Sequence, residues 1–304
     1  MSTTTPVFEP AVTRLSEVTP EPVEWLWPGR LPVGKVVVLD GDPGVGKSTL
    51  ALDLAARVTT GSPMPDGHRL SSAGGAIILS AEDGAADTIA PRMAAAGGDS
   101  SRVGLLQGCW EPAEDSRADN RMLRPIILPR DLPALAGAIR SYSARLVIVD
   151  VLMAYLDGRT DSYRDQDVRS ALAPLIRLAE DTGACIVLIR HLSKSGGTHA
   201  VYRGGGSIGI VGAARVGLLV APDPDDSDRR ILAVTKCNVA KMAPAMAYRL
   251  IGDGAHGCAR VRWEGTAPTS PPICWCCETT TLAVSLARTR PTCWPPSWQR
   301  ARCG

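Results

Sequence analysis

The sequence of 304 residues predicts an α/β fold, with a mainly parallel central sheet flanked by helices and a small C-terminal β-hairpin. Strand-like and helix-like segments alternate from about residue 33 to residue 222, which is typical of a parallel sheet wrapped by helices. A glycine-rich stretch, GDPGVGKST at 41–49, stands between an apolar run and a helical pattern. Apolar residues make up 45% of the chain, so a sizeable core is available.

Apolar runs and helical spacings predict the order of the elements. Buried strands are expected at 36–40, 76–80, 103–106, 146–150, 186–190, 216–221 and 231–235, and the hairpin at 247–251 and 259–263. Helices are expected at 47–58, 88–96 and 166–181, the last with a kink at Pro174. A further helix is expected to open at Asp131, acting as N-cap ahead of Pro133. The polar segment 109–129 is expected to be irregular.

The chain is expected to have three parts. Residues 1–24 are rich in threonine and proline and predict a flexible lead-in. Residues 25–265 carry the predicted strands and helices and form the expected α/β domain. From about 266 the chain is rich in Cys, Trp, Arg and Pro and has no sustained periodicity, so a disordered tail is expected over 266–304.

The nine cysteines distinguish the domain from this tail. Four of them occur singly, as expected for a reduced cytosolic protein: Cys109, Cys185, Cys237 and Cys258. The others begin at Cys274, and their C-x-C-C spacing lacks the matched pairs that a zinc site requires. The alternative is an out-of-frame reading of GC-rich coding DNA, and the composition of the tail favours this interpretation.

Composition and charge exclude several classes of protein. The net charge of +2 argues against a protein that coats nucleic acid passively, so any such contact must come from local patches. Aromatic surfaces for stacking bases are scarce, with one Phe and five Tyr. Apolar runs are too short to span a bilayer, and the first residues lack the apolar core of a signal peptide. A cytoplasmic location without a membrane partner is expected.

The glycine-rich stretch fits the phosphate-binding pattern G-x-x-x-x-G-K-[ST] throughout. Its glycines allow backbone N–H groups to surround phosphates at the start of a helix, where the helix dipole also favours anions. Lys47 is expected to reach the β- and γ-phosphates of a nucleoside triphosphate, and the hydroxyl of Ser48 to bind Mg²⁺. The predicted nucleotide-binding residues are Gly41, Asp42, Pro43, Gly44, Val45, Gly46, Lys47, Ser48 and Thr49.

Polar residues at the ends of later strands predict the rest of the site. Asp150 closes the apolar strand LVIVD, the position at which proteins with this loop hold Mg²⁺. Glu82 follows the strand AIILS and is the expected general base for the attacking water. His191 ends the strand CIVLIR and can contact the γ-phosphate, since α/β folds bind ligands at the carboxyl ends of their strands.

Cations late in the domain predict contacts with other molecules. The loop from Ser193 to Ser207 is rich in glycine, is basic and contains Arg203, which suits a contact with a phosphate backbone. In a ring of subunits, Arg215 and Lys236 can reach a neighbour's γ-phosphate, although the general expectation for either residue alone is a surface charge.

With these residues placed, residues 25–263 resemble the RecA-like ATPases, and specifically the RepA-like group of hexameric replicative helicases. The resemblance rests on WLWPGRLPVGKVVVLDGDPGVGKSTLALDLA, ILSAEDG, LVIVD, RHLSKSGG and YRGGGSIGIVGAAR. The last two motifs are the most specific, because the phosphate-binding loop alone is shared by many families.

The resemblance implies a central, mainly parallel sheet and ATP sites at the boundaries between subunits of a ring, expected to be a hexamer. It implies Lys47 and Ser48 at the phosphates, Glu82 as base, Asp150 at the metal and His191 as sensor. Arg215 is the first choice for a finger acting in trans and Arg203 the second. Lys236 lies in TKCN, where related rings often place an arginine two residues later, and this chain has Asn238 there. The loops from Asp157 to Asp165 and from Ser193 to Ser207 would contact single-stranded DNA.

Three functions remain open from the sequence. The first is a Mg²⁺-dependent ATPase that forms a ring and acts on single-stranded DNA as a replicative helicase. The second is a nucleotide-dependent assembly or recombination-mediator module without helicase activity. The third is a frameshifted product that only binds ATP.

Overall fold

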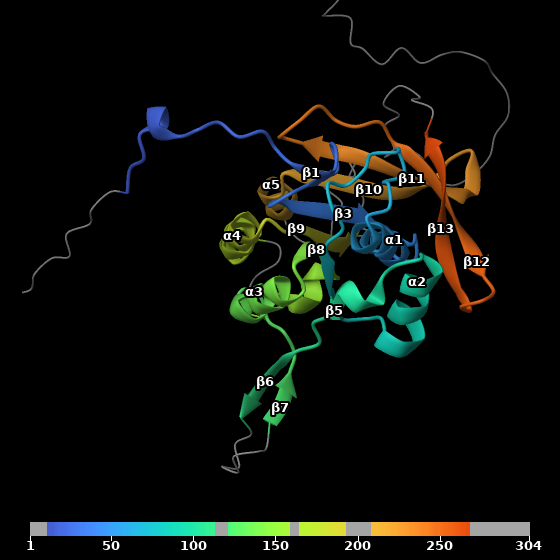
Figure 1. Ribbon diagram of the computed structural model, residues 1–304, viewed down its shortest axis with the longest axis horizontal. Coiled ribbons are helices and arrows are strands. Elements are labelled where there is room, and N and C mark those ends of the chain that lie inside the picture. Colours follow the sequence, from blue (N-terminus) through green and yellow to red (C-terminus); the bar gives the residue numbers. More distant parts are fainter. Residues whose placement is uncertain (1–10, 113–120, 159–163, 193–207, 268–304) are drawn as a thin grey trace, which may run out of the picture.

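The computed structural model describes residues 11–112, 121–158, 164–192 and 208–267 of the chain (Figure 1). Its centre is a nine-stranded sheet in the order β13-β12-β11-β10-β3-β9-β8-β4-β5. The strands β10, β3, β9, β8, β4 and β5 pair in parallel, whereas β11, β12 and β13 pair antiparallel. Their bounds are β3 Val36–Gly41, β4 Gly75–Ser80, β5 Val103–Leu105, β8 Ala144–Asp150, β9 Cys185–His191, β10 Val216–Asp223, β11 Asp226–Cys237, β12 Met246–Asp253 and β13 Cys258–Thr266.

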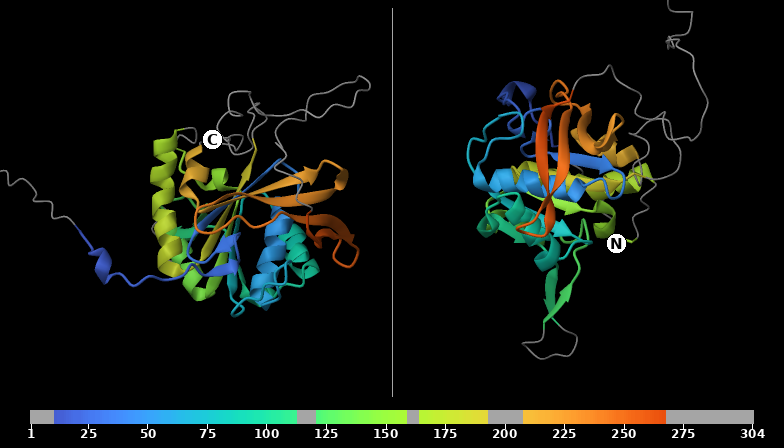
Figure 2. Two further views of the ribbon diagram at one scale, coloured as in Figure 1. Left: turned by 90° about the horizontal axis from the view of Figure 1, so that it is seen from above. Right: turned by 90° about the vertical axis from the view of Figure 1, so that its right-hand side faces the viewer.

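Helices cover both faces of this sheet (Figure 2). One face carries α1 (Lys47–Thr60) and α2 (Ala90–Ala95), the second preceded by a π-helical turn at Ala85–Ile89. The other carries α3 (Leu132–Ser141), α4 (Asp165–Thr182) and α5 (Ile208–Ala213). Single 3₁₀ turns lie at Leu15–Glu17, Ser100–Arg102 and Leu152–Tyr155. The predicted fold class is confirmed.

Strand β3 shows why these residues form the centre of the sheet. Val37 and Leu39 point into the core on the side of α1, and Val36 and Val38 into the core on the side of α4. A strand that is buried on both faces has an unbroken apolar sequence, as parallel strands usually do. The run of valines is therefore the sequence signal of this central position.

The segment 109–129 differs from the irregular excursion that the sequence predicts. It contains a hairpin, β6 (Cys109–Pro112) and β7 (Arg121–Arg124), which projects from the body of the molecule (Figure 1). Trp110 pairs with Leu123 across the two strands. The prediction missed these strands because each has only four residues, with a proline in the first and two arginines in the second.

Asp131 occupies the predicted N-cap position of α3, although its carboxylate makes no capping hydrogen bond to the helix. Its carboxylate instead accepts two bonds from the guanidinium of Arg124, at 2.7 and 2.9 Å, and one from the Ile127 N–H at 2.7 Å. Charge-assisted bidentate bonds are stronger than a neutral cap. This cluster attaches the projecting hairpin to α3. By contrast, α4 runs through Pro174 as one continuous helix.

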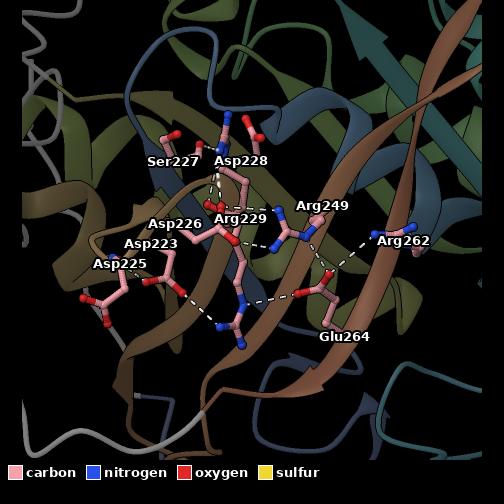
Figure 3. A network of polar contacts seen from close by, with 10 residues as sticks. Asp223, Asp225, Asp226, Ser227, Asp228, Arg229, Arg249, Arg262 and Glu264 are labelled. Atoms are coloured by element: carbon pink, nitrogen blue, oxygen red, sulfur yellow. Dashed lines mark hydrogen bonds and ion pairs between the residues drawn. The ribbon is translucent and has the colours of Figure 1, made fainter.

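The C-terminal strands extend the central sheet, since β12 pairs with β11 and β13 with β12. Ion pairs connect these strands on one face (Figure 3): Arg249 contacts Asp226 and, at 2.7 Å, Glu264, while Arg229 lies 3.3 Å from both Glu264 and Asp223. The predicted hairpin is therefore correct in its strands but belongs to the main sheet.

An aromatic cluster joins these strands to α1 and to the N-terminal strands β1 (Trp25–Trp27) and β2 (Leu31–Pro32). The indole N–H of Trp263 donates to Asp53 of α1 at 2.8 Å, and its ring packs edge-on against Trp27 with centroids 5.7 Å apart. Segments far apart in the sequence thus pack together against α1.

Within the described ranges, no helix is both long enough and apolar enough to cross a membrane. The four cysteines found there, Cys109, Cys185, Cys237 and Cys258, are free thiols. The tail from 268 onwards, including its cysteines, lies outside the described residues, as do residues 1–10 of the predicted lead-in.

Asp131→Asn should reduce the free energy of unfolding by about 1–3 kcal/mol at neutral pH, because Arg124 then loses the buried one of its two charged partners and keeps only the more exposed Glu111. The ion pair lowers the pKa of Asp131 to about 2, from an ordinary value of 3.8. A lowered folded-state pKa stabilises above the unfolded-state value, so the difference should shrink as pH falls through 3.8 towards 2. Urea unfolding across this range measures it. The surface variant Glu180→Gln is the control, and equal losses in both variants would contradict the prediction.

Candidate functional site

The phosphate-binding loop runs from the end of β3 to the start of α1. Two glycines are required there by close approaches of other segments. A Cβ at Gly41 would lie 2.7 Å from the Val220 carbonyl oxygen, and one at Gly46 would lie 2.5 Å from a Leu250 methyl group. Gly46 also has a φ of 94°, a left-handed conformation that side chains disfavour. The loop is thus held between β10 and β12, with Asp42, Pro43 and Gly44 exposed at its tip.

Lys47 is the centre of the site and is only 4% exposed. Its ammonium donates to the carbonyl oxygens of Gly41 at 2.9 Å and Asp42 at 2.8 Å, and lies 3.1 Å from Nδ1 of His191. Burial lowers the pKa of Lys47, while nearby carboxylates, Asp150 first, oppose the change. The ammonium therefore lies inside the phosphate-binding loop and is hydrogen-bonded to its backbone, next to the position expected for the phosphates.

Asp150 ends β8 and is 8% exposed. Burial raises the pKa of this carboxyl group, and the charges of Asp83 and Glu82 raise it further, whereas the hydrogen bond from Ser48 lowers it. A divalent cation beside Asp150 and Ser48 would relieve this accumulation of negative charge, so the residues present fit Mg²⁺.

Among the described residues, no cluster of three or more His, Cys, Asp or Glu side chains could hold a metal by itself. Mg²⁺ in nucleotide sites usually takes one or two protein ligands and completes its shell with phosphates and water. Ser48 and Asp150 match that smaller requirement.

Glu82 and His191, the predicted base and sensor, lie close to each other. His191 ends β9, and its Nε2 lies 3.7 Å from the Glu82 carboxylate, which is 62% exposed. His191 thus stands between Lys47 and Glu82. The structure brings together five predicted site residues: Lys47, Ser48, Glu82, Asp150 and His191.

Two of the predicted trans-acting cations, Arg215 and Lys236, lie towards the opposite ends of the parallel strands. The Arg215 N–H donates to the Val36 carbonyl at the first residue of β3. The phosphate-binding loop begins at Gly41, five residues beyond Val36 on this strand, which is about 16 Å at 3.3 Å per residue. Arg215 therefore does not belong to the site of its own chain.

Lys236 caps α5, donating to the carbonyls of Val211, Gly212 and Ala214 at 2.7–3.0 Å. Its pKa is lowered by burial first, and then by the charges of Arg215 and Arg169. Arg169 on α4 is thus a third cation of this group, and sequence reasoning missed it because it is one charge among many on a helix surface.

Several other expectations cannot be placed. Arg203 and the loop from Ser193 to Ser207 lie outside the described residues, as do residues 159–163 of the loop that begins at Asp157.

Sequence reasoning also missed Leu250 and a buried pair of Asp40 and Arg190. The pair had a visible signal, a charged residue at the end of each of two apolar strands.

As pH rises, the affinity for ATP should begin to fall before pH reaches 10.5, the ordinary pKa of lysine. The reason is that burial lowers the pKa of Lys47 in the free protein. Only the ammonium form attracts the triphosphate. Calorimetric titration with ATP as pH rises measures the fall. Lys47→Arg is the control, since arginine stays charged over this range; identical pH profiles for the two proteins would contradict the assignment.

Comparison with known proteins agrees with this geometry. A family model described as an AAA domain matches residues 3–197. The chain is 29% identical over 167 residues to the DNA repair protein RadA of Brucella abortus (strain 2308), covering 54% of this chain and 29% of that protein. It is 26% identical over 170 residues to RadA of Halalkalibacterium halodurans, covering 55% and 30%. The chain thus spans less than a third of the length of these relatives. Because the family model covers more than half of this sequence, the chain belongs to the AAA-domain family, as a P-loop ATPase of the RecA-like type.

Proposed function

We propose that this protein hydrolyses ATP with Mg²⁺ and does so as a ring-forming motor on single-stranded DNA. The observation that carries the hydrolytic part is the convergence of Lys47, His191 and Glu82, with contacts of 3.1 and 3.7 Å that run from the phosphate-binding loop to an exposed carboxylate. A site that only bound nucleotide would not need a base beside it.

The residues act in the following way. Lys47 exchanges its bonds to Gly41 and Asp42 for the β- and γ-phosphates, which raises its pKa back towards the ordinary value. Glu82, open to solvent, orients the attacking water and accepts its proton. Ser48 and Asp150 would hold Mg²⁺, and the bound cation would supply positive charge against that developing on the phosphates. His191, released by Lys47, contacts the γ-phosphate and responds to its loss.

The other half of the site comes from a second copy of the chain in this proposal. Arg215 lies at the strand ends remote from its own phosphate-binding loop, and its charge and that of Arg169 both act on Lys236. Such a cluster is expected to bind an anion. Since Lys236 already donates to three carbonyls of α5, Arg215 is the cation that reaches the neighbour's γ-phosphate.

The action on DNA has two candidate forms. The resemblance to the RepA-like group favours a replicative helicase built as a hexamer. The relatives named DNA repair proteins favour the second form, an oligomeric repair or recombination module without unwinding. A strand-displacement assay beside an ATP-dependent sizing experiment distinguishes them: unwinding supports the helicase, and ATP-dependent assembly without unwinding supports the module. ATP turnover that is unaffected by single-stranded DNA would count against both.

Glu82→Gln should lower kcat for ATP about 10²–10⁴-fold, because the amide cannot accept the proton of the attacking water. ATP affinity should change little, since Glu82 is exposed and makes no bond in the phosphate-binding loop. Steady-state turnover and nucleotide titration measure the two quantities. Asp87→Asn, an exposed acid in the following turn, is the matched control. Turnover that survives Glu82→Gln would make the base assignment wrong.

Arg215→Ala should lower turnover by about 10³–10⁵, the range for an arginine finger, and should be rescued by mixing. A Lys47→Ala subunit supplies the intact arginine to the intact phosphate-binding loop of an Arg215→Ala subunit, so the mixture should regain part of the activity. A mixture of Lys47→Ala with Glu82→Gln should regain none, because both residues act within one subunit. Mixed oligomers without recovery would show that Arg215 does not act in trans.

A further inference from the structure

A buried ion pair joins the two strands that carry the nucleotide site. The guanidinium of Arg190 on β9 donates two bonds to the carboxylate of Asp40 on β3, both at 2.8 Å. The side chains are 1% and 7% exposed. Arg190 and Asp40 are direct partners in the parallel register of the two strands, one step before His191 and Gly41.

Stability alone does not account for charges at this position. On the same face of these strands, the preceding pairs are apolar: Val36 with Ile186, and Val38 with Leu188. Burial raises the pKa of Asp40, which means that the charged form costs free energy there even with Arg190 beside it. Apolar residues in place of a buried ion pair are often neutral or stabilising. A pair that costs desolvation therefore needs another role.

The adjoining residues meet in the nucleotide site. The Gly41 carbonyl oxygen accepts from the Lys47 ammonium at 2.9 Å and from the Leu192 N–H at 3.1 Å. His191, between Arg190 and Leu192, reaches the same ammonium. A shift of β9 along β3 would move His191 relative to Lys47. Two parallel hydrogen bonds between planar groups resist such a shift more than an apolar contact can.

We propose that Asp40 and Arg190 are positioning residues, which hold β9 in register with β3 so that His191 stays aimed at Lys47 and the γ-phosphate. The proposal rests on the proposed hydrolysis of ATP. The pair does not touch the nucleotide. It acts through His191, and a displacement of about 1 Å in such a group is enough to cost up to 10²-fold in rate.

The test replaces both charges by apolar residues, as Asp40→Leu with Arg190→Leu, which continues the apolar pairs of the strands. This double variant should unfold at a denaturant midpoint close to that of the wild type, whereas either single variant leaves a buried charge and should unfold earlier. Its kcat should fall about 10- to 100-fold. Arg190→Lys, which keeps the charge but loses the bidentate geometry, should also lose turnover. Glu180→Gln, at a surface ion pair on α4, is the control.

Combination with His191→Ala distinguishes positioning from a general effect. If the pair acts by aiming His191, the double replacement should change turnover by less than about twofold once His191 is absent. A full loss on top of His191→Ala, or full turnover in the stable double variant, would overturn the proposal.

An NMR measurement, which does not depend on ATP turnover, tests this proposal independently of the proposed function. The chain has four histidines, so the ring proton of His191 can be assigned in an NMR spectrum by comparison with His191→Gln. The double replacement should shift that resonance and leave those of the other histidines in place. An unmoved His191 resonance would overturn the proposal even if the wild type showed no ATPase activity.

Discussion

The pairing of β3 with β9 at the centre of the sheet is the constraint on which the site depends. Both strands are buried on their two faces and end at the same edge, where Gly41 and His191 are register partners. Because parallel strands present their carboxyl ends together, a loop from one and a histidine from the other necessarily meet. The contact of Lys47 with both is the direct result. The residues around these strand ends therefore matter as much as the motif itself.

The charges around Lys47 and Asp150 are a second property of the site. One buried ammonium, that of Lys47, lies among the carboxylates of Asp40, Asp42, Asp150 and Glu82, all of which raise its pKa against burial. In return, Asp150 is left with more negative neighbours than positive ones. Such a site is poorly balanced when empty and gains by taking up a cation together with a polyphosphate. The shifts of Lys47 and Asp150 are thus consequences of one arrangement, and they agree with the Mg²⁺ and ATP expected from the motif.

The two ends of the parallel strands carry different groups of charged residues. The carboxyl ends of the parallel strands carry the phosphate-binding loop and the residues proposed to hold the metal and to act as base, whereas Arg215, Lys236 and Arg169 lie towards the opposite ends. The length of β3 separates these two groups, so one chain cannot bring both to the same nucleotide. In the proposed ring, a second copy of the chain would bring these cations to the nucleotide of its neighbour. The antiparallel strands β11 to β13 support this division, because they carry Lys236 at one edge and Leu250, packed on Gly46, at the other.

The sequence by itself determined the α/β class, the order of most strands and helices, and the candidates Lys47, Ser48, Glu82, Asp150 and His191. These follow from local patterns, namely apolar runs, helical spacing and polar residues that directly follow a strand. Only the tertiary structure decided that Lys236 caps α5, that Asp131 binds Arg124 and that 109–124 contains a hairpin. Likewise, only register could join Asp40 to Arg190, 150 residues apart. Pairing between distant residues depends on how strands align and helices pack, and no local pattern in one sequence carries that information.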